Sequence, residues 1–229
     1  VLTDVKNVTK LYFLGGEDIV KRDSEEINRK AIADSSGAPV VLIFPWTSES
    51  GGKAGKYGEI MRAYFKDLGA KRIEFAELLD SLQEITEKVN ASDLIYLPGG
   101  DTRLLLKRLR DSRTDSLLRK YNKVIIGNSA GALALCRDYV IVKGQGAALE
   151  TKVALGIGLA NFGVCVHYRS LREEYSGESL DKELKGLSEK VNVKIYAIPE
   201  QCALIYDEGN LEFVGDIYLF CKGKKTKCK

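Results

Sequence analysis

Apolar runs and amphipathic stretches alternate along the first part of the chain. Val40–Trp46 follows Pro39 without a polar residue, which is typical of a strand buried on both faces. A helix begins near Asp101 or Thr102, because leucines and basic residues then occupy opposite sides of the segment. The pattern predicts strands at Val8–Leu14, Val40–Trp46, Arg72–Phe75, Leu94–Leu97 and Lys123–Gly127. It predicts further helices near Ser24–Ala33, Gly58–Leu68, Leu78–Val89 and Ala130–Cys136.

Strands and helices that alternate in this way form a parallel sheet covered by helices on both faces. The later part of the chain changes character and predicts strands at Phe162–Tyr168, Val191–Ile198, Ala203–Tyr206, Leu211–Val214 and Ile217–Cys221. A turn at Asp207–Asn210 joins two of them, so we expect an antiparallel meander at the C-terminus. No linker or repeat divides the sequence. We therefore expect one three-layer α/β domain over residues 1–229.

The charge balance excludes several classes of partner. The net charge is +3, with 35 basic and 32 acidic residues, and the basic residues cluster only at Lys222–Lys229. We expect no nucleic-acid partner and no membrane segment. Five cysteines without a CxxC pair, and a single histidine, predict no metal site and no cofactor. Three of these cysteines lie in apolar runs, where a free thiol packs as a small hydrophobic residue. Unpaired thiols are typical of a reducing compartment, so we expect a cytoplasmic protein.

One segment carries the pattern of a nucleophilic serine. Gly127–Gly131 reads Gly-Asn-Ser-Ala-Gly, and the apolar run Val124–Ile126 precedes it. A helix-forming stretch follows, as a strand–turn–helix nucleophile elbow requires. The motif predicts Ser129 as the nucleophile and the amide of Ala130 as a donor to an oxyanion. The alternative is a glycine-rich turn in which the serine only caps a helix.

A second amide donor is expected from a neighbouring loop. Leu97–Thr102 also leaves a strand and enters a helix, and its two glycines allow the backbone to approach a substrate closely. The loops at the carboxyl ends of parallel strands gather at one edge of the sheet, which would place this loop beside Ser129. The alternative is an ordinary glycine turn before a capped helix.

A serine nucleophile needs a base, and His167 is the only histidine in the chain. It follows the apolar run Gly163–Val166, at a position where a loop would begin. Asp138 and Glu150 lie between Ser129 and His167, but Glu200 follows a predicted strand at its carboxyl end. We therefore expect Glu200 to orient the imidazole.

Four motifs in sequence order resemble the serine peptidase family of dipeptidase E (aspartyl dipeptidase) and cyanophycinase. They are Ile95–Thr102, Gly127–Ala132, Val166–Arg169 and Ala197–Glu200. The resemblance covers essentially the whole chain. It implies a fold similar to that of class I glutamine amidotransferases (flavodoxin-like), with a serine in place of their cysteine.

The resemblance also implies roles for individual residues. Ser129, His167 and Glu200 match the Ser-His-Glu order of the family. The amides of Gly100 and Ala130 match its oxyanion hole. The implied activity is hydrolysis of short peptides through an acyl-enzyme, with a dipeptidase that cleaves N-terminal Asp-X peptides as one case and a cyanophycinase-like or isoaspartyl-type peptidase as another.

The sequence departs from the family at one substrate contact. Dipeptidase E-like members carry Gly-Glu-Thr-Arg after the histidine, and this arginine holds the substrate's aspartate; here Gly177–Leu180 reads Gly-Glu-Ser-Leu. Arg169 or Arg172 could supply a cation instead. Together with Asp101, these arginines are the candidate substrate-binding residues.

Other interpretations fit the sequence less well. The loop Gly51–Lys56 lacks the spacing of a phosphate-binding loop, so it is a glycine-rich loop or a lid over the site. An esterase would place its acid before the histidine and its histidine near the C-terminus. A binding protein with a disabled site on the same fold is the non-enzymatic alternative. We expect a monomer or homodimer.

Overall fold

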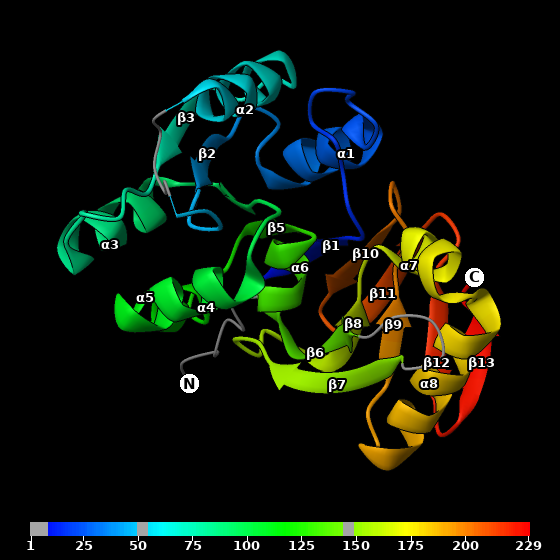
Figure 1. The fold of residues 1–229 in the computed structure, drawn as a ribbon. Coiled ribbons are helices and arrows are strands. Elements are labelled where there is room, and N and C mark those ends of the chain that lie inside the picture. Colours follow the sequence, from blue (N-terminus) through cyan, green and yellow to red (C-terminus); the bar gives the residue numbers. More distant parts are fainter. Residues whose placement is uncertain (1–8, 50–54, 144–148) are drawn as a thin grey trace, which may run out of the picture.

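The first sheet has seven strands and organises the molecule (Figure 1). The computed structural model describes residues 9–49, 55–143 and 149–229. The strand order in this sheet is β11-β10-β1-β5-β4-β2-β3. Five strands pair in parallel: β1 (Lys10–Leu14), β2 (Val40–Ile43), β3 (Arg72–Phe75), β4 (Leu94–Leu97) and β5 (Val124–Asn128). The antiparallel hairpin of β10 (Ala203–Asp207) and β11 (Asn210–Val214) extends the sheet beside β1.

Helices cover both faces of this sheet, which confirms the expected fold class. Apolar side chains of α1 (Glu25–Ser35) and α2 (Lys56–Asp67) pack on one face, against Tyr12, Val41 and Ile126. The other face receives α3 (Leu82–Ala91), α4 (Thr102–Asp111), α5 (Thr114–Leu118) and α6 (Ala130–Leu135). Side chains alternate between the two faces of a strand, so the parallel strands are apolar throughout.

A second sheet of six strands lies beyond α6, in the order β13-β12-β9-β8-β6-β7. Three of its strands pair in parallel: β6 (Cys136–Lys143), β8 (Ala160–Cys165) and β9 (Ile195–Ala197). The antiparallel members are β7 (Glu150–Leu155), β12 (Tyr218–Cys221) and β13 (Lys224–Lys227). Two helices, α7 (Tyr168–Tyr175) and α8 (Gly177–Lys190), follow β8, and Leu180 and Leu184 of α8 pack against this sheet.

The C-terminal strands are antiparallel, but they do not form the single meander expected from the sequence. β10 and β11 extend the first sheet, whereas β12 pairs with β9 in the second. Alternating apolar residues identify a strand but not its partner, because pairing is set by contacts distant in sequence. Two predicted strands are also shorter: β8 ends at Cys165 and β9 begins at Ile195. Within the described residues, no helix has the length and apolar character to cross a bilayer.

Candidate active site

Ser129 stands at a strained turn between β5 and α6. Its backbone has φ 48° and ψ −104°, a region that residues with a side chain rarely adopt. Its amide donates to the carbonyl of Leu14 at 3.1 Å. The turn is tight, since a Cβ on Gly131 would lie 2.1 Å from the carbonyl oxygen of Leu97. This geometry is that of a nucleophile elbow, with the half-buried hydroxyl at the carboxyl edge of the sheet.

His167 reaches Ser129 from the second sheet. It follows β8 with φ 54°, and its amide donates to the carbonyl of Gly15 at 2.9 Å. Its Nε2 lies 2.7 Å from the Oγ of Ser129, a hydrogen-bonding distance. In the tautomer with its proton on Nδ1, Nε2 can accept the serine proton.

Glu200 lies on the other side of the imidazole. Its Oε1 is 3.5 Å from Nδ1 of His167, longer than a good hydrogen bond. Both carboxylate oxygens are buried, and neither has a hydrogen bond of standard geometry within the described residues. Burial works against the charged form, but the nearby hydroxyl and amide of Ser170, the amide of Glu200 and the imidazole outweigh it and lower the pKa of Glu200. The residue is therefore a carboxylate facing Nδ1.

Asp138, the alternative acid, is placed differently. It lies in β6 and pairs in register with Gly163, four residues before the histidine. Its carboxylate contacts the guanidinium of Arg137 at 2.5 Å. The structure thus brings Ser129, His167 and Glu200 together and leaves Asp138 paired elsewhere.

Gly16 leaves the space that the imidazole occupies, a close approach that the sequence analysis missed. A Cβ on this residue would lie 2.5 Å from Cε1 and 2.7 Å from Nδ1 of His167. Its φ is 147°, which also favours glycine. The carbonyl of Gly16 accepts from the amide of Gln201 at 2.9 Å, so the turn after β1 joins the segments carrying the histidine and the glutamate. The available signal was the Gly-Gly pair at the end of the first strand.

One predicted oxyanion donor directly follows the serine, and the other lies in a loop beside it, where a Cβ on Gly99 would be 3.5 Å from the Cβ of Ser129. Ala130 is the first residue of α6, and an amide in the first turn of a helix has no intrahelical acceptor. Gly100 belongs to the loop after β4, and Thr47 forms hydrogen bonds with the residues before and after it. The Thr47 hydroxyl donates to the carbonyl of Gly99 at 2.7 Å, and the Thr47 carbonyl accepts from the amide of Asp101 at 2.9 Å. This support from the loop after β2 was not predicted.

The three candidate substrate-binding residues differ in what they contact. Asp101 caps α4 by accepting from the amides of Arg103 and Leu104. The guanidinium of Arg172 lies 2.6 Å from Asp181, which also pairs with Lys225, so Arg172 is already held in an ion-pair network. Arg169 is exposed at the start of α7 and forms no ion pair with another described residue.

The sequence analysis also singled out two parts of the substrate-binding region, the position of Leu180 and the Gly51–Lys56 loop. Leu180, at the position of the family's substrate-binding arginine, is fully buried under the second sheet and cannot contact a substrate. The proposed lid lies in the Gly51–Lys56 loop, of which residues 51–54 are outside the described residues.

A partly buried carboxyl group, that of Glu17, lies beside the elbow and was also missed by the sequence analysis. The amide of Glu17 donates to the side-chain oxygen of Asn128 at 3.0 Å. Its carboxylate accepts from the hydroxyl of Tyr96 and from the amide nitrogen of Asn28, both at 2.6 Å. Burial raises the pKa of Glu17 to about 7, although these two donors lower it and Asp23 raises it slightly.

Comparison with known proteins agrees with this geometry. The model of peptidase family S51 matches residues 11–214. An uncharacterized peptidase of Listeria monocytogenes is 28% identical over 142 residues, which cover 51% of this chain and 68% of the relative. An uncharacterized peptidase of Pasteurella multocida is 33% identical over 120 residues, which cover 49% of this chain and 57% of the relative.

Two crystal structures share the fold. A peptidase from an acI-B1 Actinobacterium has a TM-score of 0.69 at 18% identity, covering 96% of this chain and 94% of the other. A candidate peptidase E protein from Listeria monocytogenes has a TM-score of 0.65 at 20% identity, covering 90% and 98%. Since the family match spans both sheets and the strained serine turn, this chain belongs to peptidase family S51, a family of serine hydrolases.

Proposed function

We propose that this protein hydrolyses short peptides through a Ser129-His167-Glu200 triad, in the manner of dipeptidase E. The proposal rests above all on the 2.7 Å contact between the Ser129 hydroxyl and Nε2 of the only histidine, made at a strained elbow. The contact joins residues 38 positions apart, on different sheets. A serine that only capped a helix would not require such a partner.

The mechanism follows from the positions of the groups. His167 takes the proton of Ser129 through Nε2 as the hydroxyl attacks the scissile carbonyl. Glu200 faces Nδ1 and stabilises the imidazolium that forms. The amides of Gly100 and Ala130 donate to the oxyanion. His167 then protonates the leaving amine, and water hydrolyses the acyl-enzyme by the same route in reverse.

The contacts around the triad favour a broad first-residue preference. Leu180 is buried where the family's arginine would hold an aspartate side chain. Arg169, two residues after His167, is the remaining exposed cation that follows the histidine closely. In our proposal an N-terminal aspartate is accepted through Arg169 but is not required.

Covalent labelling tests this proposal. A serine-reactive phosphonate should add one group to the wild-type protein, located at Ser129 by mass spectrometry of digests. Ser129→Ala should abolish labelling, and His167→Ala should slow it strongly. In dipeptide hydrolysis, each variant should lower kcat by ~10⁴–10⁶ while thermal unfolding stays unchanged. Labelling at another residue, or wild-type rates in either variant, would contradict the triad.

A further inference from the structure

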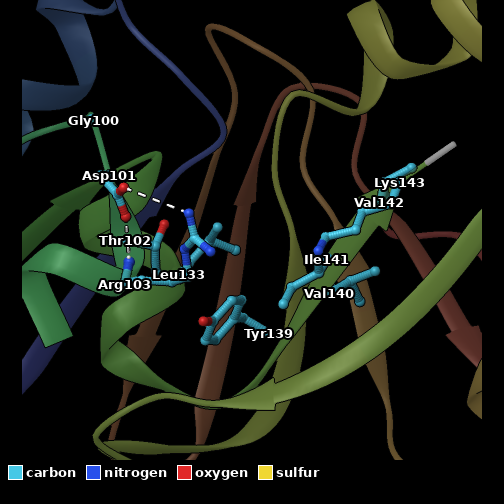
Figure 2. Close-up of a pocket in the computed structure, with 10 residues that line it drawn as sticks. All are labelled: Gly100, Asp101, Thr102, Arg103, Leu133, Tyr139, Val140, Ile141, Val142 and Lys143. Carbon is cyan, nitrogen blue, oxygen red and sulfur yellow. Dashed lines mark hydrogen bonds and ion pairs between the residues drawn. The ribbon is translucent and has the colours of Figure 1, made fainter. Parts of the chain in front are cut away.

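A cavity of about 590 Å³ lies between α4, α6 and β6 (Figure 2). This volume falls in the range of small-molecule sites. One side is formed by Gly100 and the first residues of α4, another by Leu133 of α6, and the third by β6 from Tyr139 to Lys143. None of these positions has a role in the triad itself.

The walls of this cavity are mainly apolar. Alternation along β6 turns Tyr139 and Ile141 toward α4 and α6, whereas Val140 packs on the opposite face against α8. Leu133 completes the apolar lining from the side of the elbow helix. Such a surface binds aliphatic and aromatic groups and disfavours charged ones, which would lose hydration on entering.

The charged side chains lie at the rim of this cavity, with Asp101 and Arg103 on the side of α4 and the exposed Lys143 at the end of β6. Asp101 already accepts two backbone amides at the start of α4. Arg103 lies 3.9 Å from Asp101, as the dashed line in Figure 2 shows, and its side chain is 82% exposed. Asp101 and Arg103 therefore offset each other, Lys143 adds a positive charge at the opposite rim, and the wall between the two rims is apolar.

Two residues of the cavity wall, Gly100 and Leu133, lie close to the reacting groups. The amide of Gly100 is one of the proposed oxyanion donors. Leu133 is one helical turn from the nucleophile, since its amide donates to the carbonyl of Ser129 at 3.0 Å. β6 also runs parallel to β8, with Tyr139 level with Val164, so its later residues approach the level of His167. We therefore expect a peptide held at Ser129 to place one neighbouring side chain near this cavity.

We propose that this cavity is the subsite for a bulky apolar side chain of the substrate, on one of the two residues that flank the scissile bond. The inference rests on the proposed peptidase function and adds a substrate class to it. Substrates are then short peptides with leucine, phenylalanine or a similar residue at one position. Arg169, on α7 rather than on the cavity wall, contacts the other residue.

Dipeptide hydrolysis tests the subsite. We would measure kcat/KM for a panel in which each position in turn is alanine, leucine, phenylalanine or aspartate. At one of the two positions, leucine and phenylalanine should exceed alanine by ~10–100-fold, because each buried methylene contributes to binding in a hydrophobic pocket. Aspartate at that position should be poorer than alanine.

Substitutions at Ile141 assign this preference to the cavity. Ile141→Trp fills the space and should reduce the phenylalanine-to-alanine ratio to less than ~3, since the larger side chain no longer fits. Ile141→Ala enlarges the space and should raise the ratio of tryptophan- to leucine-containing peptides. The matched control is Leu155→Trp, which adds a similar volume on β7 at a side chain 65% exposed and outside this cavity. The control should leave every ratio unchanged.

The outcomes separate the two proposals. If peptides are cleaved but neither position prefers leucine or phenylalanine, or if both Ile141 variants leave the ratios unchanged, the subsite is refuted and the triad stands. If Ile141→Trp does not fold by thermal unfolding, Ile141→Ala alone decides the question. If the wild type cleaves no peptide and a phosphonate does not label Ser129, the proposed function fails and the subsite fails with it.

Discussion

Glu17→Gln should make the protein more stable at alkaline pH and remove part of its pH dependence. The carboxyl group is partly buried beside the elbow, and its pKa lies at about 7 against an ordinary value of 4.5. Glutamine has the same shape but cannot ionise. The hydroxyl of Tyr96 can still donate to the amide oxygen. The amide of Asn28, whose oxygen has no hydrogen-bond partner among the described residues, can rotate to accept from the new NH₂ group.

The magnitude follows from proton linkage. A raised pKa means that the native state binds its proton more tightly than the unfolded chain, so native stability falls as pH rises from 4.5 toward 7. At ~1.4 kcal/mol per tenfold change, the full effect is ~3 kcal/mol. About 2.5 kcal/mol of it falls between pH 5 and pH 8. The free energy of unfolding of the variant, relative to that of the wild type, should therefore rise by about this much from pH 5 to pH 8.

Urea unfolding at pH 5 and pH 8 measures this difference. The quantity to compare is the free energy of unfolding of the variant minus that of the wild type at each pH, which cancels the other titrating groups. Glu26→Gln, an exposed glutamate on α1, is the control and should give the same difference at both pH values. A change below ~1 kcal/mol for Glu17→Gln would refute the argument that burial destabilises this carboxylate.

Three further substitutions test the geometry of the site through dipeptide hydrolysis. Glu200→Gln should lower kcat by ~10²–10⁴ because the imidazolium loses its carboxylate, and Asp138→Asn should have a smaller effect; the reverse order would reassign the acid. Gly16→Ala should lower kcat by at least ~10²-fold, since its Cβ would overlap the imidazole of His167, and activity near the wild-type level would show that the ring can move without loss. Thr47→Val removes the hydroxyl that holds the carbonyl of Gly99 and should lower kcat by ~10-fold with little change in KM; an increase in KM alone would indicate a role in binding instead.

Local patterns predicted much of this molecule. The apolar runs identified the parallel strands, and the Gly-Asn-Ser-Ala-Gly segment predicted the turn at Ser129, because a tight strand–helix junction needs small residues next to each other in sequence. The apolar run before His167 also predicted that this residue follows a strand, and it lies just after the carboxyl end of β8. These features depend on neighbours along the chain.

Features that depend on distant contacts were not predicted. Gly16 faces an imidazole 151 positions later in the chain, and Thr47 holds a loop 52 positions away. β6 and β7 carry mixed apolar and polar residues, and β7 is largely half-buried or exposed, so neither segment has the regular alternation that predicts a strand. The split of the C-terminal strands between two sheets depends in the same way on pairing partners.

The division of the triad between two sheets affects when the protein can act. Ser129 belongs to the first sheet, His167 follows a strand of the second, and Glu200 lies where the chain passes from β9 in the second to β10 in the first. A partly folded chain with only one sheet formed has no complete set of reacting groups. Peptide cleavage through the proposed triad therefore requires both sheets to be folded and packed together.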